Sequence, residues 1–154
     1  MGALVGVKAI GIEGTIHCLT TSVKGIYSLL SSIGTHDGAT DVNIHLKRLD
    51  LESKIRLVDC IIKDIRAVET NTLAMCISDI KESLTNLEQI LQAINERIKY
   101  NNSIWVCRSF RSYGFTDILP QLDIAVTILL DRRSALFDVL RINDKLGAIS
   151  PIEK

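Results

Sequence analysis

A run of apolar residues spaced alternately four and three positions apart is the feature that most constrains the fold of this chain. It consists of Leu73, Ile77, Ile80, Leu84, Leu87, Leu91, Ile94 and Ile98. This alternation places the apolar side chains in a seam along one side of an α-helix. A helix of about 28 residues is about 42 Å long. Such a length is typical of a helical bundle and too great for a compact α/β domain.

The same spacing near the N-terminus predicts a first helix over residues 4–33. Its seam consists of Ile12, Ile16, Leu19, Val23, Ile26, Leu30 and Ile33. A stripe of small residues lies beside the seam: Gly11, Thr15, Cys18, Ser22 and Gly25. Small side chains let a neighbouring backbone approach, but each glycine lowers helix stability by about 1 kcal/mol relative to alanine. We therefore expect this helix to depend on packing.

Two further helices follow from the rest of the sequence. Residues 34–41 form a linker, with Gly34 expected as a left-handed C-cap and Asp41 as an N-cap. The next helix carries a broad apolar face: Ile44, Leu46, Leu49, Leu51, Ile55, Leu57, Val58, Ile61, Ile62 and Ile65. Polar residues 69–72 are expected to cap the helix that contains the first seam.

The last helix is expected to begin near Asp117, with Pro120 in its first turn, and to end by Gly147 and Pro151. Its seam consists of Leu122, Val126, Leu129, Leu136 and Leu140. Arg133 interrupts this seam, and we expect it to form a polar layer with Asp131 and Asp138. The sequence thus predicts a single all-α domain over residues 1–154, an antiparallel four-helix bundle.

The composition is that of an ordinary folded domain. A chain of 154 residues has the length of one domain, and 47% hydrophobic with 23% charged residues excludes a disordered or collagen-like chain. Lysine plus arginine equals aspartate plus glutamate at 18 each, so no net charge draws the whole chain to nucleic acid or to an anionic membrane. We expect any electrostatic partner to bind a local patch.

The cysteines and the N-terminus bear on location. Four cysteines are spread along the chain without a C-x-x-C pair: Cys18, Cys60, Cys76 and Cys107. This spacing fits neither a zinc site nor a disulfide scaffold, so we expect free, largely buried thiols. Lys8, Glu13 and Lys24 interrupt the apolar N-terminal stretch, which argues against a signal peptide or a membrane span. We expect an intracellular, cytoplasmic or virion-associated protein that is not secreted.

The sequence lacks the motifs of catalysis. It contains no G-x-S-x-G, no phosphate-binding G-x-x-x-x-G-K-[ST], no H-E-x-x-H and no G-x-G-x-x-G. His17 and Cys18 are adjacent, but neighbours on a helix point in different directions; His36 and His45 are expected to be solvated. No histidine follows a glutamate by three positions, as helical di-iron sites require. We predict no enzymatic activity, no cofactor and no metal, while a small apolar ligand between helices stays compatible with the pattern.

Residues 95–115 form a segment rich in aromatic and basic side chains, the basic–aromatic segment, with a connection between helices over 100–116. It holds five of the seven aromatic residues, and no acidic residue follows Arg97 within it. Tryptophan, tyrosine and arginine are enriched in interface hot spots. The predicted partner-binding residues are Arg97, Lys99, Tyr100, Trp105, Arg108, Phe110, Arg111 and Tyr113.

Four explanations of this segment stay open. The aromatics could fill the end of the bundle core while the arginines cap helix carbonyl groups. The segment could instead bind a protein, anionic lipid head groups or single-stranded nucleic acid. We predict a protein partner or self-association, with no specific nucleic acid. Membrane contact is the less favoured alternative.

Two resemblances to known proteins follow, the first over about the central half of the chain and the second in the overall plan of the helices. Residues 49–56 and 97–105 resemble short helical proteins of large nucleocytoplasmic DNA viruses, which implies a virion or minor capsid protein. The plan of a glycine-punctuated apolar first helix followed by amphipathic ones is similar to the cell-death four-helix bundles of the MLKL and HeLo type. That likeness implies oligomerisation and membrane attack, but the first helix here is not strongly basic.

Overall fold

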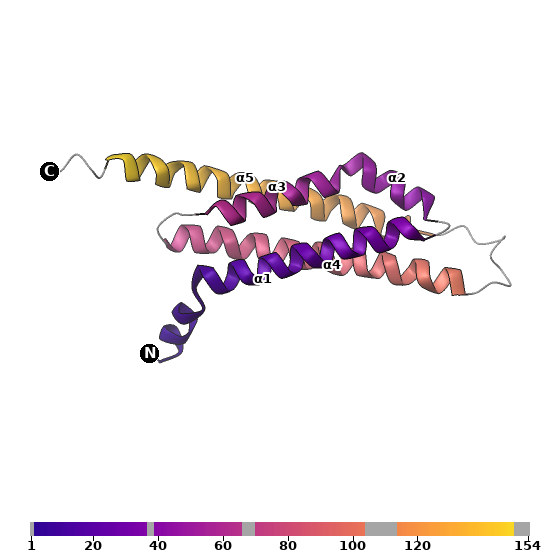
Figure 1. Ribbon diagram of the computed structural model, residues 1–154, viewed down its shortest axis with the longest axis horizontal. Coiled ribbons are helices and arrows are strands. Elements are labelled where there is room, and N and C mark those ends of the chain that lie inside the picture. The colour runs from indigo at the N-terminus through magenta and orange to yellow at the C-terminus, as the bar shows by residue number, and fades with distance from the viewer. Residues whose placement is uncertain (1, 37–38, 66–69, 104–113, 150–154) are drawn as a thin grey trace.

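The apolar periodicity of the sequence produces helices throughout the part of the chain that the structure describes. The computed structural model describes residues 2–36, 39–65, 70–103 and 114–149, and side chains from residue 14 to residue 143 within those ranges. The helices are α1 (Gly2–Thr35), α2 (Thr40–Leu49), α3 (Leu51–Asp64), α4 (Asn71–Ser103) and α5 (Leu119–Ile149) (Figure 1). These ranges contain no strand. The prediction of an all-α protein is confirmed.

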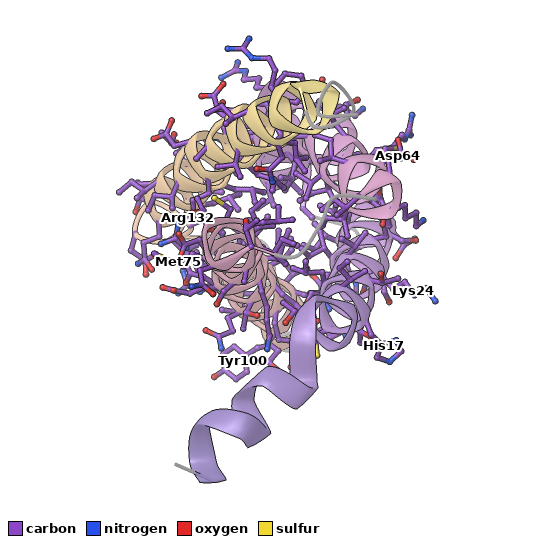
Figure 2. All side chains as sticks on the ribbon, turned by 90° about the vertical axis from the view of Figure 1, so that its left-hand side faces the viewer. His17, Lys24, Asp64, Met75, Tyr100 and Arg132 are labelled. Carbon is purple, nitrogen blue, oxygen red and sulfur yellow. The ribbon has the colours of Figure 1, made fainter. Side chains whose placement is uncertain are left out.

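The long helices lie lengthwise beside one another, with α4 in contact with both α1 and α5 (Figure 1). In the end-on view α5 and α3 occupy the upper half, and α4 and α1 the lower half (Figure 2). The first turns of α1 leave this arrangement and lead away from the other helices in both views. The N-terminal end of α1 therefore projects from the body of the molecule.

Helices α1 and α4 pack side by side and run in the same direction. Ser32 donates a hydrogen bond of 3.1 Å to Oδ1 of Asn95, and seven residues earlier on each helix Gly25 faces Glu88. Equal steps along both helices are possible only in a parallel pair. The close approach at Gly25 also explains one glycine of the small-residue stripe, because a methyl group there would overlap the Glu88 carboxylate. The exposed Cys18 of that stripe has no such role in this structure.

Helices α4 and α5 run in opposite directions. Arg97, near the end of α4, binds Asp117 just before α5, while Arg132 in the middle of α5 reaches back to Asp79 and Ser83. The predicted seam of α4 is buried in full, as is most of the seam of α5. On α5, Leu140 and Arg133 are only half-buried.

The second predicted helix is two helices, because the chain breaks at Asp50. Asp50 adopts the left-handed conformation, with φ of 49° and ψ of 44°. Aspartate tolerates this region better than most residues. Its N–H donates to Lys47 O, and the Lys54 amine donates to Leu49 O, so two of the carbonyl groups at the end of α2 receive donors from beyond the helix. Ile44 and Leu57 are exposed, contrary to the broad apolar face that the sequence predicted.

The predicted helix ends were correct at two places and wrong at two. Thr70 Oγ1 accepts a hydrogen bond from Leu73 N and caps α4, and Pro120 lies in the first turn of α5. Gly34 lies inside α1 with an ordinary helical backbone, because the helix continues to Thr35. Asp41 is inside the first turn of α2, where Ala39 is the N-cap.

Candidate protein-interaction site

The end of the molecule where α4 finishes and α5 begins holds the described part of the basic–aromatic segment. Arg97 donates through Nη1 to Asp117 Oδ1 at 2.7 Å and through Nη2 to Asp117 Oδ2 at 3.2 Å. Its Nη1 also donates to the carbonyl of Gly114 at 2.8 Å. A bidentate pair of this kind fixes both distance and orientation. The end of α4 and the start of α5 are thereby tied together.

The electrostatics of this pair follow from its hydrogen bonds. The hydrogen bond from Arg97 lowers the pKa of Asp117 below its ordinary value, and the same bond raises the pKa of Arg97. Both side chains contact solvent, so water and salt screen their attraction. The pair therefore acts mainly as a geometric clamp.

Phe115 anchors the turn that precedes α5. Its side chain is 3% exposed, and its ring centroid lies 5.8 Å from Cζ of Arg97, within the range of a cation–π contact. The carbonyl of Phe115 accepts hydrogen bonds from the N–H groups of Ile118 and Leu119. One aromatic of the segment is therefore buried in the core, as the core-filling explanation expects, whereas Arg97 binds the carbonyl of Gly114, which lies outside the helices.

Lys99 and Tyr100 are exposed on the last turns of α4, and Tyr100 retains 62% of its surface accessibility. Figure 2 shows Tyr100 on the lower side of the molecule, pointing outwards. The remaining predicted site residues lie outside the described residues: Trp105, Arg108, Phe110, Arg111 and Tyr113. The structure thus separates the predicted set, because Arg97 has partners within the chain whereas Lys99 and Tyr100 face solvent.

Sequence reasoning missed the partners of Arg97. Asp117 and Gly114 were not among the predicted site residues, although Asp117 is the first acidic residue after Arg97. In a segment of uniformly basic charge, the nearest carboxylate at its end is the natural partner of an arginine near its start. That signal was available in the sequence.

The polar contact of α5 with the middle of α4 is made by Arg132 and not by Arg133. Arg132 Nη1 donates to Asp79 O at 2.7 Å and to Ser83 Oγ at 2.9 Å, and Ser83 is buried. Asp131 and Asp138, the expected partners of Arg133, are both exposed. The predicted polar layer is therefore shifted by one residue and is directed towards α4.

The cysteines and histidines differ from expectation at several positions. Cys18 and Cys60 are free and exposed, while burial raises the pKa of the half-buried Cys76 thiol; Cys107 lies outside the described residues. His45 is not simply solvated, because its Nε2 lies 2.6 Å from Asp123 Oδ1 on α5. This contact ties α2 to α5.

Other features of the described surface are modest. A hollow of about 300 Å³ lies between α1 and the α2–α3 break, lined by apolar Leu30, Leu46 and Leu51 and by four polar residues. Within the described ranges no three histidine, cysteine or acidic side chains lie close enough together to hold a metal ion. No helix among the same residues is long and apolar enough to cross a membrane.

Comparison with known proteins found no match: no family model, no curated protein and no solved structure is significantly similar to this chain.

Proposed function

We propose that this chain is a non-enzymatic helical-bundle protein that acts through protein–protein contacts as a structural or assembly component. The observation that carries the proposal is the clamp of Arg97 on Asp117 and Gly114, beside the exposed Lys99 and Tyr100. The clamp holds together the two described ends of the connection that is rich in hot-spot residue types, so these ends need no further ordering when a partner binds.

The proposal includes a bundle of four columns, with α2 and α3 together forming the second column. Support comes from the order of directions, since consecutive columns alternate along the chain in Figure 1. In this arrangement α1 and α4 are the parallel neighbours that share the Ser32–Asn95 contact. A rigid bundle suits an assembly role because it presents side chains on fixed elements.

The place of action is also part of the proposal. The resemblance of residues 49–56 and 97–105 to helical proteins of large nucleocytoplasmic DNA viruses favours a minor capsid or other virion component, made in the cytoplasm and packaged. Quantitative mass spectrometry of purified particles tests this directly. Absence of the protein from particles would remove the virion part and leave a cytoplasmic assembly factor.

A second candidate function is that of a membrane-active, oligomerising bundle of the cell-death type. One observation favours it: the first turns of α1 project from the body, and residues 3–12 contain a single charge, Lys8. Flotation with anionic liposomes at low and moderate salt, followed by a leakage assay, separates the two functions. Salt-sensitive binding with leakage supports the membrane function, and absence of binding supports the assembly function.

The assembly function is tested by replacing Trp105 and Arg108 with alanine. Partner recovery by cross-linking should be lost, while helicity and the melting temperature stay unchanged. A matched control is Lys81→Ala with Asn86→Ala, on the exposed face of α4 away from this end. Loss of folding in the Trp105 and Arg108 variant would instead support the core-filling explanation.

A further inference from the structure

Helix α2 buries fewer side chains than α3 or α4. It buries two, Val42 and Leu46, against four in α3 and ten in α4. It contacts α3 and α5, while the most extensive contacts of the bundle join α1 to α4 and α4 to α5. Packing of an apolar face supplies most of the stability of a short helix in a protein. Helix α2 is therefore held in place by little apolar burial.

The helical backbone is interrupted between α2 and α3. Asp50, at the break, has a φ of 49° and is the one non-glycine residue with a positive φ in the described part of the chain. Its side chain makes no capping hydrogen bond to α3. Helix formation is cooperative along a continuous run of backbone hydrogen bonds, so a break limits how far unwinding spreads. The two helices can therefore open separately.

The packing of α2 is incomplete on the side of α1. The hollow of about 300 Å³ lies there, and Leu30, Leu46 and Leu51 form its apolar wall. A side chain beside a hollow lacks partner atoms on that side and loses the dispersion energy that close packing provides. Leu46, one of the two buried residues of α2, is therefore less firmly anchored than a side chain in the middle of the core.

One polar side-chain contact joins α2 to another helix in the described part of the chain. Nε2 of His45 lies 2.6 Å from Oδ1 of Asp123 on α5. The two side chains are 26% and 46% exposed, so solvent moderates the strength of the contact. Because α2 has little apolar burial, a contact of moderate strength is a large part of what holds it against α5. We call the His45–Asp123 contact the latch.

We propose that α2 is a cover that opens on its own while α3, α4 and α5 stay folded, and that the latch holds it closed. Opening releases Val42 and Leu46 from the core and uncovers the side of α5 that carries Asp123. Elements that move in regulation come from the least stable parts of a fold. The proposal concerns a different part of the molecule from the basic–aromatic segment, so its failure would leave the proposed function standing.

The first test is amide hydrogen exchange of the full-length chain at neutral pH, followed for single amides by NMR. The opening equilibrium constant of the α2 amides should exceed that of the α3 and α4 amides at least about a hundredfold. Low concentrations of urea should raise exchange in α4 steeply and in α2 only slightly, because a local opening exposes little surface. Equal opening constants in α2 and α4, or joint opening of α2 with α3, would refute the proposal.

The second test removes the latch from the side of α5. Asp123→Ala should raise the opening constant of the α2 amides about tenfold and leave those of α3 and α4 unchanged. The matched control is Asp131→Ala, which removes an exposed aspartate from the same helix at a position without a described contact to α2. Unchanged exchange in α2, or an equal increase in α2, α3 and α4, would overturn the proposal.

The third test concerns the break at Asp50. Alanine tolerates the left-handed conformation less well than aspartate, and opening of α2 frees residue 50 from that conformation. Asp50→Ala should therefore raise the opening constant of the α2 amides about fivefold without changing those of α3. Asp50→Asn, which keeps a side chain suited to this conformation, is the control and should leave exchange unchanged. No effect of Asp50→Ala, or an equal effect on α2 and α3, would show that α2 does not open separately at this residue and would overturn the proposal.

Discussion

Helix α4 makes two large contacts of opposite kinds, with α1 on one side and α5 on the other. The α1–α4 contact joins parallel helices through a neutral hydrogen bond from Ser32 to Asn95 and through the close approach of Gly25 to the Glu88 side chain. The α4–α5 contact joins antiparallel helices through two arginines, Arg97 and Arg132. Apolar seams alone leave the longitudinal position of helices weakly determined. Directional polar contacts restrict it on both sides of α4.

The two kinds of contact differ in how much variation in side-chain size and backbone spacing they tolerate. A neutral pair inside a helix interface costs little to desolvate, but it requires small residues at matched positions. The long aliphatic part of an arginine side chain lets its guanidinium group reach a carbonyl group on a neighbouring helix. An arginine contact therefore tolerates looser spacing between the two backbones. The α1–α4 register should therefore be sensitive to side-chain size and the α4–α5 register to charge and hydrogen-bonding capacity.

The largest effect among the polar contacts is expected for Arg132→Ala. This change leaves Ser83 Oγ and Asp79 O without a charged donor, and Ser83 is buried. A hydrogen bond to a charged group contributes about 1.5–3 kcal/mol, which solvent contact of Arg132 reduces to about 1–2 kcal/mol. Urea denaturation measures the change in the free energy of unfolding.

The neighbouring Arg133→Ala variant is the control for that prediction. Both changes remove a half-buried arginine from α5, but Arg133 has no hydrogen bond to α4 among the described residues. Arg133→Ala should cost less than Arg132→Ala. The opposite order would restore Arg133 as the residue that fixes the register.

A smaller loss is expected when the neutral pair of the α1–α4 contact is broken. Ser32→Ala removes the donor to Oδ1 of Asn95, which is 3% exposed, and should lower the free energy of unfolding by about 1 kcal/mol. Asn95→Leu in the Ser32→Ala background should recover part of this loss, because the polar group left without its donor is also removed. A double-mutant cycle from thermal melts measures the coupling. Strict additivity of the two changes would mean that the pair contributes nothing to the contact.

Much of the helix arrangement could be predicted from the sequence, because the apolar residues of long helices recur with a strong periodicity. The seam of α4 from Leu73 to Ile98 is buried throughout, as its spacing predicted. The antiparallel arrangement of α4 and α5 follows from the sequence, because a short connection between consecutive helices brings the second helix back alongside the first. The parallel contact of α1 with α4 could not be predicted, because seam spacing gives no information about which columns are neighbours.

The break at Asp50 left a signal that was misread. The buried positions around it are Val42, Leu46, Leu51 and Ile55, with steps of four, five and four. A step of five does not fit a continuous helix seam, so it marks a change of register. A single broad apolar face that includes the exposed Ile44 conceals that step and predicts one helix where the structure has two.

The candidate site was predictable only in its composition. Aromatic and basic residues concentrate in the sequence at 95–115, but sequence alone does not distinguish a side chain that fills the core from one that faces solvent. Phe115 and Tyr100 have similar chemistry and opposite burial. Phe115 lies just before α5 with its ring in the core and beside Arg97, whereas Tyr100 lies on the exposed face of α4.

Glycine to alanine substitutions should separate packing from helix propensity within α1. Gly34 has open space around it, so Gly34→Ala should raise the free energy of unfolding by about 0.5 kcal/mol through helix propensity alone. Gly25→Ala should gain less, because the new methyl group displaces the Glu88 carboxylate. Adding Glu88→Ala should remove the difference between the two sites. A Gly25→Ala gain equal to that of Gly34→Ala, measured by thermal denaturation, would mean that the close approach at Gly25 places no limit on α1.

The smallest effect is expected for the Arg97–Asp117 clamp, and it depends on pH. The hydrogen bond from Arg97 lowers the pKa of Asp117 below its ordinary value of 3.8. A carboxyl group whose pKa is lower in the folded state stabilises the fold above its unfolded pKa, and this contribution is lost as the pH falls through the folded pKa. The stability difference between wild type and Asp117→Asn should therefore be constant from neutral pH down to the ordinary pKa and then shrink below it. Urea denaturation of both proteins across this range measures that difference, and a difference that grows on acidification would contradict the clamp. Because Arg97 stays charged throughout, any pH dependence of the contact must come from the carboxylate side, which distinguishes this end of α4 from the neutral Ser32–Asn95 pair in its contact with α1.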